Sequence, residues 1–485
     1  MQVSIRRNLA WMGASQAALV VVQFAGSVVI ARLLSPREMG IYAVGAAVVG
    51  IVNLIRSFGL NSLIIREAEL APHLTATIFT INAGLNVACA LVIFALSWVG
   101  SEFLGDPGVG QVLRFLAIMP LVNSLEFLPS ILLERNGAFR TIASINVGKT
   151  LINSGVTVLM AAFGFSYMSI VLGSLAANLF GTACFNGFGW KFASLRLGLQ
   201  EWRRVGRFGL QMLTIGAVAG ITGRLTDLLI GRLIDLSALG LYSRATGING
   251  LLWDNLHLVV SRVVFVDFAE QHRRRLSLRD SYLKILAILT AFLWPAFTGM
   301  AILAGPLVLN IYGEKWLGAA EPLALLSLAC VFYVAIAMTW EIYMISGEVS
   351  RQVTVELKHN LVGSALFALG CLGGLAWAAA SRIGDALYMI FLVKADLERL
   401  TGTRPSDYPR IYLHSAGLTL LACGPAALVM LLNGWSAETS LIALLAAVAC
   451  GVCAWALGLR HLQHPICHEV EAVARRVLGR PQMGA

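Results

Sequence analysis

Ionisable side chains interrupt several long apolar runs of this chain. An ionised group at the middle of a bilayer costs roughly 2.5–3.5 kcal/mol on insertion scales, so it is expected to face water or to pair with another charge. Arg224 and Asp227 are three residues apart, as are Arg382 and Asp385, so each pair shares one helix face. Either pair could neutralise itself and ease insertion, or open to bind a charged solute or a proton. A shifted helix boundary would instead place the second pair in an outer loop.

Two lysines stand singly in other apolar runs. Lys149 and Lys358 follow the arginines of two polar turns, Arg140 and Arg351, by nine and seven residues. A lysine at such a place either reaches a central cavity or extends its ammonium back to the membrane surface.

Glu126 stands alone in the middle of a long apolar run, between Pro120 and Pro129. A lone buried carboxylate tends to be protonated, which a proton-coupled carrier could use. A hydrogen bond to a backbone carbonyl freed at a proline kink explains it equally. Arg244 and Asp254 are ten residues apart, close to three helical turns, and can face one side of a helix.

The composition of the chain indicates the medium around these charges. Of its 485 residues, 58% are hydrophobic and only 13% are charged. Soluble domains carry about 25% charged residues, so the sequence excludes an ordinary cytosolic enzyme, a nucleic-acid binder and a disordered scaffold. We expect surrounding lipids as partners and no nucleic acid.

The apolar residues gather in runs that are long enough to cross a bilayer as helices. They are continuously apolar without two-residue alternation, which favours helices over a β-barrel. The sequence therefore predicts an all-α integral membrane protein with about 14 transmembrane helices. The predicted spans are 8–34, 39–63, 75–99, 110–133, 141–163, 167–190, 205–231, 238–262, 284–311, 319–345, 352–371, 374–397, 411–432 and 438–459.

The distribution of positive charge predicts the orientation of these spans. The loops of one side hold 24 of the 36 lysines and arginines, whereas those of the other side hold only four. Because lysine and arginine are retained in the cytoplasm, both termini are expected there. The four on the outer side are Arg32, Arg37, Arg232 and Lys315.

An internal repeat divides the predicted spans. ARLLSPREMGIYAVGAAVVG (31–50) returns 200 residues later as GRLIDLSALGLYSRATGING (231–250), with five identities without a gap. Each string joins the first and second spans of a six-span block, so the blocks form a parallel repeat with a transport path between them. We predict an N-terminal six-helix lobe (1–200), a C-terminal six-helix lobe (201–400), and a linker, two added helices and a basic cytoplasmic tail (401–485).

The same strings carry a family resemblance. ARLLSPREMGIYA with GLNSLIIRE, and TDLLIGRLIDLSALGLYSRA with SRVVF, resemble the polysaccharide-synthesis transporters, which are Wzx-type lipid-linked oligosaccharide flippases, in the branch of the colanic-acid exporter. The resemblance implies a bacterial inner-membrane transporter and not an enzyme. Such a protein flips an undecaprenyl-pyrophosphate-linked oligosaccharide to the outer leaflet by alternating access, for exopolysaccharide, capsule or O-antigen assembly. It also implies coupling to H⁺ or Na⁺, with a polysaccharide polymerase and glycosyltransferases as partners. We expect no cofactor and no metal.

A pyrophosphate cargo gives the buried charges expected roles. Bare phosphate cannot cross hydrocarbon, and arginine grips phosphate with its planar fork while remaining charged. The predicted substrate-binding residues are Lys149, Arg224, Arg244, Lys358, Arg382, Arg56 and Arg114. The predicted ion-coupling residues are Asp227, Glu126 and Asp254.

Two other functions stay open. One is a multidrug extruder of the same superfamily, which should have an acidic pathway lined with aromatic residues if it exports cationic drugs. The other is a non-transporting membrane scaffold of polysaccharide assembly. The mixture of buried arginine, lysine and carboxylate favours an anionic cargo over both.

Overall fold

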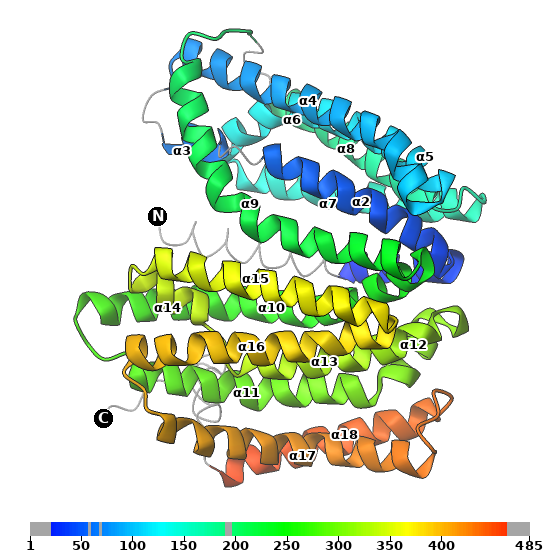
Figure 1. Ribbon diagram of the computed structural model, residues 1–485, viewed down its shortest axis with the longest axis vertical. Coiled ribbons are helices and arrows are strands. Elements are labelled where there is room, and N and C mark those ends of the chain that lie inside the picture. The colour runs from blue at the N-terminus through cyan, green and yellow to red at the C-terminus, as the bar shows by residue number, and fades with distance from the viewer. Residues whose placement is uncertain (1–20, 57–59, 67–69, 190–195, 463–485) are drawn as a thin grey trace. The chain divides into compact units, whose positions relative to one another are not determined.

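The computed structural model describes residues 21–56, 60–66, 70–189 and 196–462 (Figure 1). Within these ranges, the side chains of residues 55–56, 62, 65–66, 210–222, 254–259 and 262–263 lie outside the description. Every regular element of the described residues is a helix, and no strand occurs among them. The chain is therefore all-α, as its continuous apolar runs predict.

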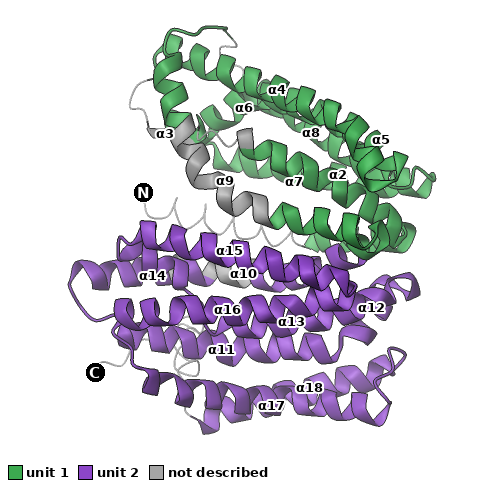
Figure 2. Ribbon diagram, in the orientation of Figure 1, with its two compact units in different colours: residues 1–240 green, residues 241–485 purple. Residues whose placement is uncertain are grey.

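Residues 1–240 form the first of two compact units (Figure 2). The apolar helix Val21–Leu33 begins the described part of this unit. It is followed by α2 (Pro36–Arg56), α3 (Leu60–Arg66), α4 (Pro72–Leu104), α5 (Pro107–Leu116), α6 (Ile118–Arg135), α7 (Phe139–Ala162), α8 (Met168–Gly189) and α9 (Trp202–Leu233). Buried side chains such as Ile64, Ile78, Leu128 and Val205 hold α3, α4, α6 and the start of α9 together.

Residues 241–485 form the second unit. The helix α10 (Leu236–Arg273) begins in the first unit and continues into the second. The elements that follow are α11 (Arg279–Ile302), α12 (Ala304–Tyr312), η1 (Glu314–Ala319), α13 (Ala320–Val334), α14 (Thr339–Ile345), α15 (Val349–Leu372), α16 (Leu375–Thr401), η2 (Pro405–Asp407), α17 (Tyr408–Leu432) and α18 (Leu441–His461). Its core includes the fully buried rings of Phe268, Tyr282 and Phe297.

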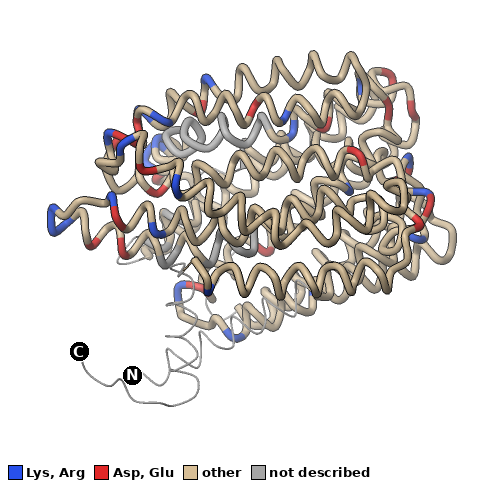
Figure 3. The backbone as a smooth tube through the Cα atoms, turned by 90° about the horizontal axis from the view of Figure 1, so that it is seen from below, with Lys and Arg blue, Asp and Glu red and all other residues tan. Residues whose placement is uncertain are grey.

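Nine helical segments in the described ranges are long and apolar enough to cross a membrane. Four further helices, α7, α9, α10 and α15, have 24, 32, 38 and 24 residues, and helices of this length can also span about 30 Å. Together with Val21–Leu33, these helices occupy all the predicted apolar runs, although crossing by all fourteen stays a prediction. Figure 3 shows the charged residues concentrated near helix ends, with few in the stretches between them.

Three predicted spans contain breaks that their apolar sequence does not signal. The run 110–133 is divided between α5 and α6 at Ala117, 284–311 between α11 and α12 at Leu303, and 319–345 between α13 and α14. The break in 319–345 ends at Met338, whose φ of 66° lies in the left-handed region. Irregular backbone at membrane depth is tolerated where it lines a cavity or is buried in protein, and this break lines the cavity described below.

Two glycines of the repeat make reciprocal close contacts. A Cβ atom on Gly40 would lie 1.7 Å from the carbonyl oxygen of Leu236, and one on Gly240 would lie 1.9 Å from that of Pro36. Pro36 and Leu236 are themselves 200 residues apart, so equivalent positions of the two strings meet each other. Any side chain at either glycine would strike backbone, which explains two identities of the repeat physically.

Candidate functional site

An ion pair joins two of the predicted site residues in the first unit. Lys149 on α7 places its Nζ 2.8 Å from Oε1 and 3.1 Å from Oε2 of Glu126 on α6. The two side chains are 22% and 15% exposed, so the pair is partly shielded from solvent. Glu126 is therefore not isolated, although its sequence neighbours implied that it was.

Helix α8 supplies the space and the polar groups around this pair. A Cβ atom on Gly181 would lie 2.6 Å from Cδ of Lys149, so only glycine lets the lysine pass along α8 without displacement. One turn further along α8, the Phe185 ring centroid lies 6.0 Å from the lysine Nζ, within the range of a cation–π contact. Thr182 lies 3.5 Å from Oε2 of Glu126.

Pro129 in α6 leaves one backbone carbonyl without its helical partner, and a residue other than Glu126 binds that carbonyl. Pro129 has no N–H, which frees the carbonyl of Leu125 four residues before it. Asn186 on α8 donates its Nδ2 to that carbonyl at 3.1 Å. Glu126 thus has Lys149 as a charge partner, and the carbonyl that Pro129 frees accepts a hydrogen bond from Asn186.

A buried carboxylate organises a second polar cluster in the second unit. Asp385 on α16 is 3% exposed and accepts hydrogen bonds at Oδ2 from Tyr333 of α13 at 2.9 Å and from Arg382 at 3.3 Å. Its Oδ1 lies 2.9 Å from Nε2 of His359 on α15. The predicted pairing of Arg382 with Asp385 is present, and it belongs to a network of three helices.

A glycine and an aromatic ring of α15 lie against this network. A Cβ atom on Gly363 would lie 2.3 Å from Oδ1 of Asp385, so glycine permits the close approach of the carboxylate. The guanidinium carbon of Arg382 lies 4.3 Å from the ring centroid of Phe367. Tyr242 on α10 approaches Arg382 Nε with its hydroxyl at 3.5 Å.

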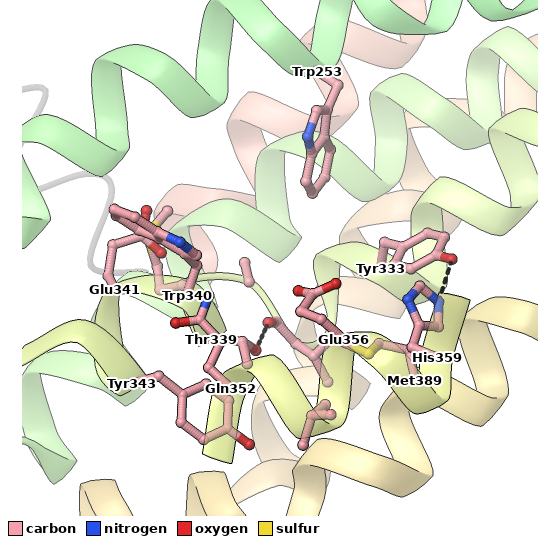
Figure 4. A pocket seen from close by; sticks show the side chains of 14 residues that line it. Trp253, Tyr333, Thr339, Trp340, Glu341, Tyr343, Gln352, Glu356, His359 and Met389 are labelled. Atoms are coloured by element: carbon pink, nitrogen blue, oxygen red, sulfur yellow. Dashed lines mark hydrogen bonds between the residues drawn. The ribbon is translucent and has the colours of Figure 1, made fainter. Parts of the chain in front are cut away.

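A cavity of about 240 Å³ adjoins this network (Figure 4). Its lining includes Glu341 on α14 and Glu356 on α15, together with Trp253 and Trp340. Ser261 donates a hydrogen bond to Glu341. Tyr333 and His359 belong both to this lining and to the Asp385 network, so the cavity and the network are continuous.

The other predicted substrate-binding residues are distributed over both units. Arg244 is 8% exposed and lies 5.0 and 5.1 Å from the ring centroids of Tyr312 and Trp316. Arg114 is exposed and lies 6.0 Å from the Trp98 ring centroid.

The remaining predicted residues lie on α9, on α15, or at positions whose side chains are outside the description. Arg224 is exposed and lies against Gly50, where a Cβ atom would be 2.6 Å from its Nε, and Asp227 is half-buried one turn further along α9. Lys358 is exposed and does not line the cavity that the neighbouring positions of α15 line. The side chains of Arg56 and Asp254 lie outside the described residues.

Sequence reasoning did not assign a role to His359 or Tyr333, because it weighed only groups with a formal charge at neutral pH. One signal was available. His359 is three residues after Glu356, a spacing that places both side chains on one helix face.

The sequence of this chain is similar to those of known proteins. Residues 29–321, more than half of the chain, match the family described as "Polysaccharide biosynthesis protein". The Lipopolysaccharide biosynthesis protein WzxC of Escherichia coli (strain K12) is 24% identical over 368 residues, which cover 75% of this chain and 74% of that protein. The Succinoglycan biosynthesis transport protein ExoT of Rhizobium meliloti (strain 1021) is 25% identical over 330 residues, covering 67% of this chain and 66% of that protein.

A solved structure shows the same fold. The Lipid II flippase MurJ in an inward closed conformation superposes with a TM-score of 0.73 at 13% identity, and the match covers 97% of this chain and 100% of that one. The chain therefore shares the all-helical fold of that protein, and the family match includes the strings that carry the repeat. The chain belongs to the polysaccharide biosynthesis protein family.

Proposed function

We propose that this protein flips an undecaprenyl-pyrophosphate-linked oligosaccharide from the inner to the outer leaflet of the bacterial cytoplasmic membrane. It does so by alternating access, coupled to H⁺ or Na⁺, and it acts as a transporter and not as an enzyme. Its termini are cytoplasmic, its two six-helix lobes move against each other, and it serves exopolysaccharide, capsule or O-antigen assembly beside a polymerase and glycosyltransferases. Family membership, the fold and the names of the relatives support this proposal.

The Lys149–Glu126 ion pair is the observation that carries the proposal. Breaking a buried ion pair by removing one partner costs about 3–5 kcal/mol, but exchanging one anionic partner of lysine for another avoids most of that cost. A phosphate oxygen of the headgroup replaces Glu126 as the partner of Lys149. Glu126, left in a poorly solvated place without its counter-charge, then takes up a proton. Headgroup binding and proton uptake are thereby linked at one site.

The second unit supplies a further place for ion coupling. Its cavity of about 240 Å³ brings Glu341 and Glu356 next to the network of Asp385 and His359. A water molecule takes about 30 Å³, so this volume suits an ion with a few waters. These groups join Glu126, Asp227 and Asp254 as the proposed coupling residues, with Arg224, Arg244 and Arg382 kept as proposed headgroup ligands.

One observation favours the multidrug extruder as a second candidate. The same cavity is acidic and lined by Trp253 and Trp340, as a site for organic cations should be. Pockets for drug-sized ligands measure about 300–1,000 Å³, so the cavity is small for that role.

A transport assay separates the two candidates. The protein is reconstituted in proteoliposomes with a fluorescently labelled undecaprenyl-pyrophosphate sugar, and the label accessible from outside is followed over time. We expect Lys149→Gln to abolish flipping and the exposed control Lys315→Gln to retain it. Normal flipping by Lys149→Gln contradicts the role of this lysine. Uptake of a lipophilic cation without flipping of the lipid favours the extruder.

A further inference from the structure

A second and larger cavity lies in the first unit, away from the Lys149–Glu126 pair. Its volume is about 370 Å³, within the range of about 300–1,000 Å³ that ligand pockets occupy. Three chain segments line it, namely the start of α2 at Arg37, the α4–α5 junction at 104–106 and the α9–α10 junction at 231–237. The corresponding ends of α2, α5 and α9 lie together at one end of the unit (Figure 1).

One side of the cavity is a fixed acid–arginine pair. Asp106 is 8% exposed, and it accepts a hydrogen bond at Oδ1 from the backbone N–H of Gly108 at 2.8 Å. Its Oδ2 accepts from a terminal nitrogen of Arg37 at 2.9 Å. The Arg37 side chain is 67% exposed, and a guanidinium has five N–H donors, so this anchored arginine retains donors for a ligand.

The α9–α10 junction adds a stacked arginine and a second carboxylate to the lining. The guanidinium carbon of Arg232 lies 5.1 Å from the ring centroid of Phe103. A guanidinium that stacks on a ring keeps its N–H groups in the plane, free to point to a ligand. Asp235 accepts from the N–H of Ala238 through Oδ1 at 2.7 Å, and its exposed carboxylate has further acceptor sites.

The balance of these groups identifies the class of ligand. Two arginines and two aspartates leave the cavity without net charge, so neither a bare phosphate nor an organic cation is favoured. Hydroxyl groups donate and accept, and they can satisfy guanidinium and carboxylate edges together. Leu104 and Ile234 in the lining add apolar surface for the C–H face of a ring, and Phe103 supports the Arg232 guanidinium.

We propose that this cavity binds a sugar residue of the transported glycan, a contact separate from the headgroup site. The inference rests on the proposed function for the nature of the cargo. With both termini in the cytoplasm, the α4–α5 and α9–α10 junctions face the outside, where a glycan arrives after crossing. The cavity then helps to hold the glycan at the exit and contributes to the choice of sugar.

The test measures sugar binding without transport. The full-length protein in lipid nanodiscs is mixed with millimolar D-glucose, D-galactose or N-acetyl-D-glucosamine, and saturation-transfer-difference NMR reports bound sugar protons. We expect binding of at least one sugar, weakened about tenfold in Arg232→Gln and in Phe103→Leu. Arg203→Gln is the matched control, because Arg203 stacks on Trp202 at 5.7 Å but lines neither cavity. Size-exclusion profiles confirm that each variant is folded.

Three results would overturn the inference. These are no saturation transfer from any of the sugars to wild type, an equal loss in Arg203→Gln, and displacement of the sugar by millimolar inorganic phosphate, which would assign the cavity to an anion. Failure of the flippase proposal is distinguishable, because it shows in the proteoliposome assay. Sugar binding that depends on Arg232, by a protein that does not flip the lipid, would sink the proposed function and leave this site standing.

Discussion

The ammonium of Lys149 lies 2.8 Å from a carboxylate oxygen of Glu126, across the contact between α7 and α6. One residue was expected to bind a headgroup and the other to carry an ion, and the structure joins them in a single pair. In this pair each charge is neutralised by the other. A ligand that takes one partner must leave the other to find a proton or a new counter-ion, which is the link that a coupled transporter requires.

The pair should show coupled energetics. Removing either charge leaves the other partly buried without a partner, whereas removing both does not. We expect Glu126→Gln to destabilise the wild-type protein more than it destabilises Lys149→Met, with a coupling energy of about 0.5–3 kcal/mol. Thermal unfolding of the four proteins in one detergent measures this. Strictly additive effects would mean that the pair makes no energetic contribution.

Gly181 should matter for transport without mattering for folding. Alanine there would press on the lysine side chain, with its Cβ atom 2.6 Å from Cδ of Lys149, and shift it away from Glu126. Glycine to alanine in a helix otherwise stabilises by about 0.5–1 kcal/mol. We expect Gly181→Ala to reduce flipping about tenfold, corresponding to roughly 1.4 kcal/mol, at a nearly unchanged unfolding temperature, because the gain in helix stability offsets the weakened ion pair.

The matched control for that change is on the same helix. A Cβ atom on Gly187 would meet nothing within 4 Å, so Gly187→Ala should flip like wild type. Equal activity of the two alanine variants would show that the position of the Lys149 side chain is unimportant.

Asp385 should couple transport to an ion gradient. Its carboxylate is contacted by Tyr333, His359 and Arg382, so an amide in its place removes the charge on which the network converges. We expect Asp385→Asn to exchange lipid-linked sugar without a gradient and to gain nothing when a proton or sodium gradient is imposed. Asp280→Asn, at an exposed carboxylate, is the control. A gradient response like that of wild type in Asp385→Asn would remove this residue from the coupling site.

The polar turn before α15 should give the protein a defined acid sensitivity. The pKa of Glu348 is held below its ordinary value chiefly by hydrogen bonds from Arg399, at 2.5 and 2.6 Å. A carboxylate with a lowered folded-state pKa stabilises above its unfolded pKa of about 4.3, and this contribution is lost as the pH falls through the folded value.

Unfolding temperatures measured across pH test that expectation. We expect wild type to exceed Glu348→Gln by a constant margin from about pH 8 to about pH 5, and the margin to shrink progressively as the pH falls below about 4.3 toward the lowered folded-state pKa. The exposed Glu314→Gln serves as the reference for a carboxylate on another turn. A margin that persists undiminished at about pH 3 would show that the contact with Arg399 is not the cause.

Sequence patterns predicted the helices and the contacts between residues of one helix. They did not predict contacts that depend on how different helices pack. The Arg382–Asp385 contact follows from a spacing of three residues, and the helices follow from their apolar runs. The Lys149–Glu126 pair joins residues 23 apart on different helices, so its formation depends on how α6, α7 and α8 pack. No spacing rule gives that arrangement.

The break between α13 and α14 was missed for another reason. Its residues are apolar, so the run 319–345 has the composition of one continuous helix, and the left-handed Met338 carries no glycine signal. The repeat glycines show the opposite case. Their identity was visible in the sequence, but the reason, contact of Gly40 and Gly240 with backbone carbonyls, required coordinates.

The most direct measurement of the central claim is flipping of a labelled undecaprenyl-pyrophosphate sugar by the purified protein in proteoliposomes, compared for wild type, Lys149→Gln and Lys315→Gln. The account predicts that the label becomes accessible on the far leaflet with wild type and Lys315→Gln and stays inaccessible with Lys149→Gln. Equal flipping by all three proteins, or flipping by none while a lipophilic cation is transported, would contradict it.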